Sequence, residues 1–215
     1  MDLTIHARVG GPGTGDAPEI VERKGRGHPD TICDFLAETV SLALSRAYVE
    51  RFGAILHHNV DKVLLCGGRS YARFGGGEVL LPIELYLAGR ATTSVGSQSI
   101  PVEELAIEGS RTWLRDHLHA LEVERHVVVH NKVRQGSRDL TQLFTRGHND
   151  VARANDTSIG VGYAPISPLE RLVLRTERML NEQSRSSRSA WGEDTKVMAA
   201  RHGNAVSITV ACAMI

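Results

Sequence analysis

The sequence of 215 residues lacks the features that specify a disulfide framework or a membrane span. It contains three cysteines, an odd number with no Cys-x-x-Cys pair, which argues against a disulfide framework and against a structural zinc site. Its apolar runs are of strand length, far short of the ~20 residues that a bilayer requires, and no signal-peptide pattern follows the first residues. We therefore expect a cytoplasmic protein that does not insert into a membrane.

An excess of charge of one sign is also lacking, because 25 Lys and Arg residues balance 25 Asp and Glu residues. A nucleic-acid-binding protein needs a basic surface to displace counterions, so this balance argues against such a partner. Lysine itself is scarce, with four residues against 21 arginines. Because an ammonium group is a compact, strongly hydrated point charge, a lysine in such a chain marks a candidate site.

The hydrophobic content of 41% indicates a globular protein, and apolar periodicity predicts helices and strands in mixed order. Helices are predicted from Pro29, after Pro101 and after Ser167, which begins a capping box that ends at Glu170. Residues 67–77, with five glycines, are predicted to form a mobile loop, and residues 182–190 a polar linker. Strands are predicted at residues 60–66, 78–87, 127–130, 195–200 and 205–215. The fold class is therefore α+β.

The chain is divided into a flexible lead, residues 1–18, and two α+β modules, residues 19–125 and 126–215. The final strand ends within an apolar run, and such a strand needs a neighbour for its buried face. We therefore expect the second module to be incomplete at its C-terminus and the chain to be truncated.

His28 and Asp30 lie where a glycine-containing loop runs into the predicted helix that begins at Pro29. Backbone N–H groups and the positive end of a helix dipole favour an anion such as phosphate at such a junction. His28 could donate a hydrogen bond to a leaving oxyanion, and Asp30 could bind a hard cation such as Mg²⁺. The structural alternative is a hydrogen-bonded loop histidine and a carboxylate that only favours the helix dipole.

Three further polar clusters contain candidate substrate-binding residues. Asp61, beside Lys62, precedes an apolar strand, where it either contacts a substrate or solvates the start of the strand. Asp156 either pairs with a substrate ammonium group or caps an Asx-turn. Asp194 and Lys196 share one face if they lie on a strand, so they either meet an anionic group and its metal or form a surface ion pair.

Six separated motifs follow one another along the chain, namely Gly27-His28-Pro29-Asp30 and residues 61–65, 74–77, 89–92, 154–165 and 192–198. In this order they resemble the motifs in about the N-terminal half of the archaeal-type S-adenosylmethionine synthetases, also called methionine adenosyltransferases. Six motifs in one order are far more restrictive than a single glycine signature. The resemblance implies an α+β fold of repeated modules, with mixed and antiparallel sheets packed against helices.

The resemblance implies that S-adenosylmethionine is formed from ATP and L-methionine, with release of phosphate and diphosphate. His28 would then face the oxygen that leaves C5′ of ATP, Asp30 would bind Mg²⁺, and Lys196 would contact the phosphates. Asp156 would lie near the substrate amino acid, with Asp194 as a further substrate contact. The resemblance also implies a loop that covers the site and a homodimer or larger assembly. It further implies a requirement for K⁺, which cannot be assigned to a residue of this chain.

Two hypotheses follow from a resemblance that covers only about the N-terminal half of the family's sequences. In the first, the chain is the N-terminal part of a methionine adenosyltransferase. On its own it would bind ATP poorly, because the other half carries further phosphate-binding and metal-binding motifs. In the second, it is a non-catalytic half-length paralogue that associates with or regulates a full-length subunit.

Overall fold

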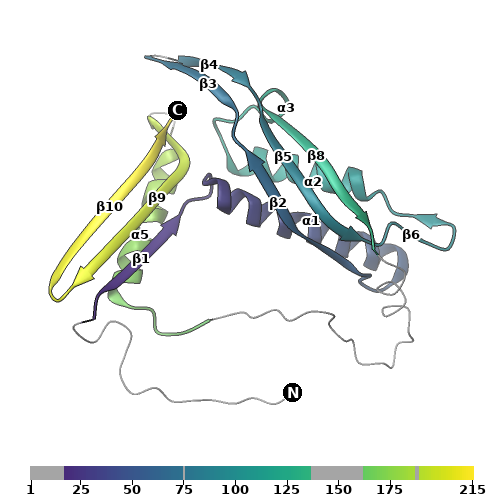
Figure 1. The fold of residues 1–215 in the computed structure, drawn as a ribbon, viewed down its shortest axis with the longest axis horizontal. Helices are drawn as coiled ribbons and strands as arrows, with labels where there is room; N and C mark the ends of the chain where they lie inside the picture. The colour runs from purple at the N-terminus through teal and green to yellow at the C-terminus, as the bar shows by residue number, and fades with distance from the viewer. Residues whose placement is uncertain (1–16, 75, 137–161, 187–188) are drawn as a thin grey trace. The chain divides into compact units, whose positions relative to one another are not determined.

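The computed structural model describes residues 17–74, 76–136, 162–186 and 189–215. Within these ranges the chain has an α+β fold, as predicted, and it divides into two compact units (Figure 1). No helix in the described ranges combines the length and the apolar character of a membrane span. The elements are β1 (Glu19–Lys24), α1 (Pro29–Phe52), β2 (His58–Cys66), β3 (Arg69–Arg73), β4 (Gly76–Leu81), β5 (Ile83–Ala91), β6 (Ser94–Val95), β7 (Gln98–Ser99), α2 (Val102–His117), α3 (Val123–His126), β8 (Val127–Gln135), α5 (Pro168–Ser184), β9 (Trp191–His202) and β10 (Ala205–Met214).

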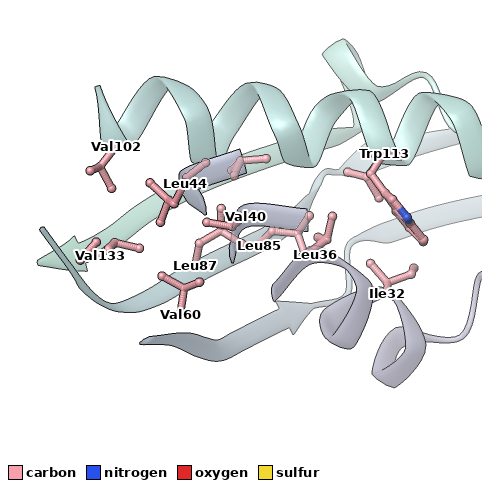
Figure 2. Packing of buried hydrophobic residues seen from close by; sticks show 14 of the residues in the cluster. Ile32, Leu36, Val40, Leu44, Val60, Leu85, Leu87, Val102, Trp113 and Val133 are labelled. Atoms are coloured by element: carbon pink, nitrogen blue, oxygen red, sulfur yellow. The ribbon is translucent and has the colours of Figure 1, made fainter. Parts of the chain in front are cut away.

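The unit that contains α1 through β8, here called the α1 unit, has a three-stranded sheet in the order β2-β5-β8. β2 is antiparallel to β5, and β8 is parallel to β5. The crossover between the parallel strands β5 and β8 therefore contains α2 and α3. Leu36, Val40 and Leu44 recur at a four-residue spacing and form the buried stripe of α1. Figure 2 shows these side chains beside Leu85 and Leu87 of β5.

Helix α1 begins at Pro29, as predicted, because proline needs no N–H partner in the first helical turn. The helix ends at Phe52, and Gly53 follows with a φ of 72°. This left-handed conformation favours glycine, whose N–H here donates to the Val49 carbonyl over 2.9 Å. Both ends of the longest helix are therefore specified by residues that the sequence makes visible.

The prediction of a loop at residues 67–77 is wrong for most of its length. β3 and β4 form an antiparallel hairpin there, and the predicted strand at residues 78–87 is divided at Pro82 between β4 and β5. The glycines concealed the hairpin because glycine is depleted in strands, and Pro82 ends a strand because it cannot donate to a ladder. Helix α5 also continues to Ser184, into the segment predicted to be a linker.

The second unit, here called the β1 unit, consists of β1 with the following residues up to His28, α5, β9 and β10. Its sheet has the order β1-β9-β10 and is antiparallel throughout, with β9 in the centre. α5 packs on β9 and β1 through a small core that contains Leu169, Val173 and Val197. The predicted capping box of α5 is confirmed, because the Ser167 side chain accepts a hydrogen bond from the Glu170 N–H over 3.0 Å.

These units group the described residues differently from the modules expected at residues 19–125 and 126–215. β1 pairs with β9, near the other end of the chain, so one unit is assembled from two distant segments. Such pairing leaves no local pattern in the sequence, which is why the periodicity of each segment does not reveal it. Most of the lead predicted at residues 1–18 lies outside the described residues.

Candidate functional site

The loop that follows β1 is joined to the beginning of β9 by backbone hydrogen bonds. The Gly25 N–H donates to the Thr195 carbonyl over 2.7 Å, and the Gly27 N–H donates to the Glu193 carbonyl over 3.0 Å. The His28 N–H turns back to the Gly25 carbonyl over 3.2 Å. These contacts continue the β1–β9 pairing beyond Lys24 and hold His28 beside β9.

Glycine is required in this loop because the backbones of the loop and β9 approach each other closely. A Cβ atom at Gly25 would lie 2.3 Å from the Thr195 Oγ1, and one at Gly27 would lie 2.6 Å from the Asp194 nitrogen. Neither distance leaves room for a side chain. The glycines therefore allow the loop to lie directly against β9. The binding of an anion by this loop stays a prediction.

A partly buried polar network under the loop is centred on Glu177 of α5, and sequence analysis missed it. The Glu177 carboxylate accepts a hydrogen bond from Arg23 Nε over 2.7 Å and another, also over 2.7 Å, from Asn181 Nδ2. Asn181 Nδ2 also lies 3.0 Å from the Thr195 Oγ1. A signal did exist, because Glu177 continues the four-residue spacing of the buried Leu169 and Val173 and so places a carboxylate on the apolar stripe.

The opposite face of the same sheet carries Glu22, Lys24 and Lys196. Val197 is buried against α5, so by strand alternation Lys196 points away from the helix. Lys196 Nζ lies 2.8 Å from one Glu22 carboxylate oxygen, and Lys24 Nζ lies 3.9 Å from the other. The hydrogen bond from Lys196 lowers the pKa of the Glu22 carboxyl, and the charges of Lys24 and His28 lower it further.

Asp194 lies on β9 at the place where His28 approaches. Burial raises the pKa of the Asp194 carboxyl above its ordinary value, and the nearby His28 opposes this effect. Asp194 in turn adds to burial in raising the pKa of the Cys212 thiol on β10. An imidazole and two carboxylates, those of Asp194 and Glu22, are therefore electrostatically coupled within the β1 unit.

The structure brings three of the six predicted site residues into one unit, namely His28, Asp194 and Lys196. Asp30 lies in the first turn of α1, and Asp61 lies on β2, so both belong to the α1 unit.

Asp61 is exposed and accepts a hydrogen bond from Lys62 Nζ over 2.8 Å. Asp156 lies outside the described residues. The roles assigned to these six residues stay predictions.

Within the ranges that the structure describes, no three His, Cys, Asp or Glu side chains are grouped closely enough to enclose a metal ion. This arrangement is compatible with Mg²⁺, which keeps several waters and needs only one or two carboxylates when substrate phosphates supply further oxygens. The Asp30 carboxylate is a hard oxygen donor of the required type and is exposed at the start of α1.

Residues 3–215 match the sequence model of the family described as S-adenosylmethionine synthetase (AdoMet synthetase). The chain belongs to this family. Two segments of the β1 unit, one around His28 and one at residues 192–198, carry motifs through which the sequence resembles the S-adenosylmethionine synthetases. They are far apart in the chain and meet through the β1–β9 pairing.

Curated members of the S-adenosylmethionine synthetase family are about half identical to the chain. The probable S-adenosylmethionine synthase of Aquifex aeolicus is 54% identical over 200 residues, which are 92% of this chain and 50% of the relative. The S-adenosylmethionine synthases of Pyrobaculum neutrophilum and Pyrococcus furiosus are 52% and 50% identical, again over 92% of this chain and 50% of each relative. The chain therefore spans about half the length of the curated relatives that it matches.

A solved structure supports the same fold. The chain is similar to an unusual S-adenosylmethionine synthetase from Campylobacter jejuni, with a TM-score of 0.50 and 12% sequence identity, over 91% of this chain and 48% of that chain. At this level of identity the similarity shows the fold alone.

Proposed function

We propose that the chain is the N-terminal part of a methionine adenosyltransferase, which forms S-adenosylmethionine from ATP and L-methionine. The observation that carries the proposal is that His28, Asp194 and Lys196 lie in the same compact unit. The chain that contains them is a member of the S-adenosylmethionine synthetase family. The proposal includes a cytoplasmic location and a homodimer or larger assembly, as the family resemblance implies.

In the proposed reaction, the methionine sulfur forms a bond to C5′ of ATP while the C5′–O bond breaks. The electron pair of that bond leaves with the triphosphate, which water then cleaves to phosphate and diphosphate. A departing polyanion is stabilised by donors and cations that are aimed at its oxygens before the reaction begins. His28 would donate a hydrogen bond to the leaving oxygen, and the Lys196 ammonium group would bind the phosphates.

The carboxylates have separate roles in this proposal. Asp30 would hold Mg²⁺, which when bound neutralises charge on the phosphate oxygens. Asp156 would pair with the ammonium group of methionine, and Asp61 and Asp194 would be further substrate contacts. K⁺ is retained as an additional ion without an assigned residue.

The half-length match motivates the second hypothesis, a non-catalytic paralogue that associates with or regulates a full-length subunit. The two hypotheses predict different behaviour of a completed chain. If the chain is the catalytic N-terminal part, joining it to the C-terminal half of the Aquifex aeolicus relative restores the missing motifs and yields product. If it is a regulator, the fusion is inactive.

The test measures S-adenosylmethionine formed from ATP, L-methionine and Mg²⁺ by three samples: the 215-residue chain, the fusion, and the full-length relative as positive control. Product from the fusion supports the proposal. A folded fusion without product, beside an active relative, contradicts it. Co-purification of the 215-residue chain with the full-length relative and a changed rate of that relative would then establish the regulatory alternative.

A further inference from the structure

The three-stranded sheet of the α1 unit is covered on one face by two helices. α1 packs on β2, α2 packs on β8, and the two helices contact each other, with the ring centroids of Phe35 and Trp113 5.2 Å apart. Figure 2 shows side chains of both helices with Leu85 and Leu87 of β5. Two helices are needed because packed helices lie about 8–10 Å apart and neighbouring strands only about 4.8 Å, so one helix covers about two strands.

The three-stranded sheet of the β1 unit has one helix on its covered face, within the residues that the structure describes. This helix, α5, packs on β1 and β9, whereas β10 lies at the edge. Val210 and Ile208 of β10 lie directly opposite Val197 and Ala199 of β9, and directly opposed residues share one face of a sheet. Val197 and Ala199 are buried against α5, but Val210 and Ile208 stay 44% and 45% exposed on the same face.

A second apolar surface lies on the side of α5 that is turned toward β10. Glu177 marks the other side of the helix, because its carboxylate accepts a hydrogen bond from Arg23 Nε of β1 over 2.7 Å. Leu172 and Met179 are about 140° and about 160° around the helix from Glu177, at about 100° per residue. Since β10 lies beyond β9 from β1, this side of α5 is the one next to β10. The side chains of Leu172 and Met179 are 42% and 48% exposed.

These two apolar stripes, Leu172 and Met179 on α5 and Ile208 and Val210 on β10, are here called the α5–β10 surface. A helix that lies beside α5 contacts both stripes at once, as α2 beside α1 contacts both α1 and β8. A strand added at the edge of β10 would leave both stripes in water, and a flat sheet would be kept away from β10 by α5. Exposed apolar side chains that gather in this way mark an interaction surface, and its shape favours a helix.

We infer that the α5–β10 surface binds an amphipathic helix from the C-terminal half of the family's chain. The inference rests on the proposed function, in which this chain is the N-terminal part. The 200 matched residues are 50% of the Aquifex aeolicus relative, so that relative contains about as many residues again. A unit built from distant segments has a precedent in this chain, because β1 pairs with β9 from the other end of the sequence.

The test follows the oxidation of Met179 by hydrogen peroxide, measured by mass spectrometry, in the 215-residue chain and in the fusion with the C-terminal half of the Aquifex aeolicus relative. Oxidation follows exposure, so we expect Met179 to react at least about fivefold more slowly in the fusion. Ile208→Asp places a charge on the surface and should restore fast oxidation in the fusion. Ile20→Asp is the matched control, because Ile20 is exposed on the opposite face of the sheet, and it should leave Met179 protected.

Equal rates for Met179 in the chain and the fusion would overturn the inference, as would equal effects of Ile208→Asp and Ile20→Asp. Protection of Met179 in the 215-residue chain, with the mass of a dimer in light scattering, would instead assign the surface to a second copy and also overturn it. Ile208→Asn replaces Ile208→Asp if circular dichroism shows that the aspartate variant is unfolded.

This result is separable from that of the proposed function, because oxidation of Met179 is measured without turnover. An active fusion in which Met179 is unprotected refutes only the inference. An inactive fusion in which Met179 is protected, and in which Ile208→Asp removes the protection, refutes only the enzyme assignment.

Discussion

Asp194 is the residue at which burial and charge act most clearly against each other. Burial disfavours its anionic form, and the imidazole of His28 favours it. A carboxylate held in this balance beside an imidazole can change its protonation or its partner when a polyanion binds. The environment of Asp194 is thus a second reason, beside its place in a sequence motif, to regard it as a candidate site residue.

The raised pKa of Asp194 predicts a pH-dependent contribution to stability. Since the folded protein binds this proton more strongly than the unfolded protein, the contribution is present at low pH and is lost as the pH rises from 3.8, the ordinary pKa, through the raised value. Asp194→Asn is therefore expected to gain free energy of unfolding relative to the wild type across that pH range and not below it.

Urea unfolding of both proteins at a series of pH values measures this difference. Asp34→Asn, at an exposed position of α1, is the control for the loss of an aspartate. Parallel pH profiles for the wild type and Asp194→Asn would show that Asp194 does not titrate as its burial predicts.

At the scale of elements, the loop of residues 25–28 follows β1, is hydrogen-bonded to β9 and determines where His28 lies. The glycines of the loop allow its backbone to pack closely against β9. Glu177 and Asn181 of α5 are hydrogen-bonded to each other beneath the loop. A helix, two strands and a loop therefore position one imidazole. Changes in the loop should affect stability and the site together, because the same contacts serve both.

Gly27→Ala tests this dependence. The added Cβ would lie 2.6 Å from the Asp194 backbone nitrogen, so the loop must move, and we expect a loss of about 1–3 kcal/mol in the free energy of unfolding. Gly162→Ala, with no atom within 4 Å of the added Cβ, is the control in the same unit. Equal unfolding midpoints for the two variants in urea would contradict the proposed packing of the loop.

The elements show which features a sequence can reveal. Helix α1 is predictable because Leu36, Val40 and Leu44 recur at helical spacing, and α5 is predictable because Ser167 and Glu170 form a capping box. These signals are local, since each lies within a few residues of the structure that it specifies.

The site is less predictable because its contacts are not local. Lys24 and Lys196 are opposed only through the pairing of two segments from opposite ends of the chain. Glu22 therefore gave no signal as a partner of Lys196, although His28, Asp194 and Lys196 could each be found from their motifs. The pattern of α5 contained Glu177 on its apolar stripe, but its partner Arg23 lies on a distant strand.

At the scale of the whole molecule, the residues that the structure describes form two hydrophobic cores, one in each unit. The core of the α1 unit is the larger, and that of the β1 unit is small and supplemented by polar contacts under the loop. On β10, the side chains of Val206, Ile208 and Val210 are between 44% and 51% exposed. The β1 unit therefore buries only part of the apolar surface of this strand.

Leu44→Ala tests the larger core. Leu44 is fully buried on α1, and its truncation should reduce the free energy of unfolding of the α1 unit by about 2–5 kcal/mol, because a cavity remains. Leu42→Ala, on the same helix and 46% exposed, should change it by less than about 0.5 kcal/mol. Similar losses for both leucines in thermal unfolding would contradict the assigned core.

The central claim is that His28 and Lys196, from opposite ends of the chain, act together on the departing triphosphate. Its most direct test is the rate of S-adenosylmethionine formation by the fusion that carries His28→Ala or Lys196→Ala, with Lys132→Ala as control. We predict a loss of at least about 100-fold for each of the first two variants and a wild-type rate for the control. Rates within about twofold of the wild type in folded His28→Ala and Lys196→Ala proteins would contradict the account.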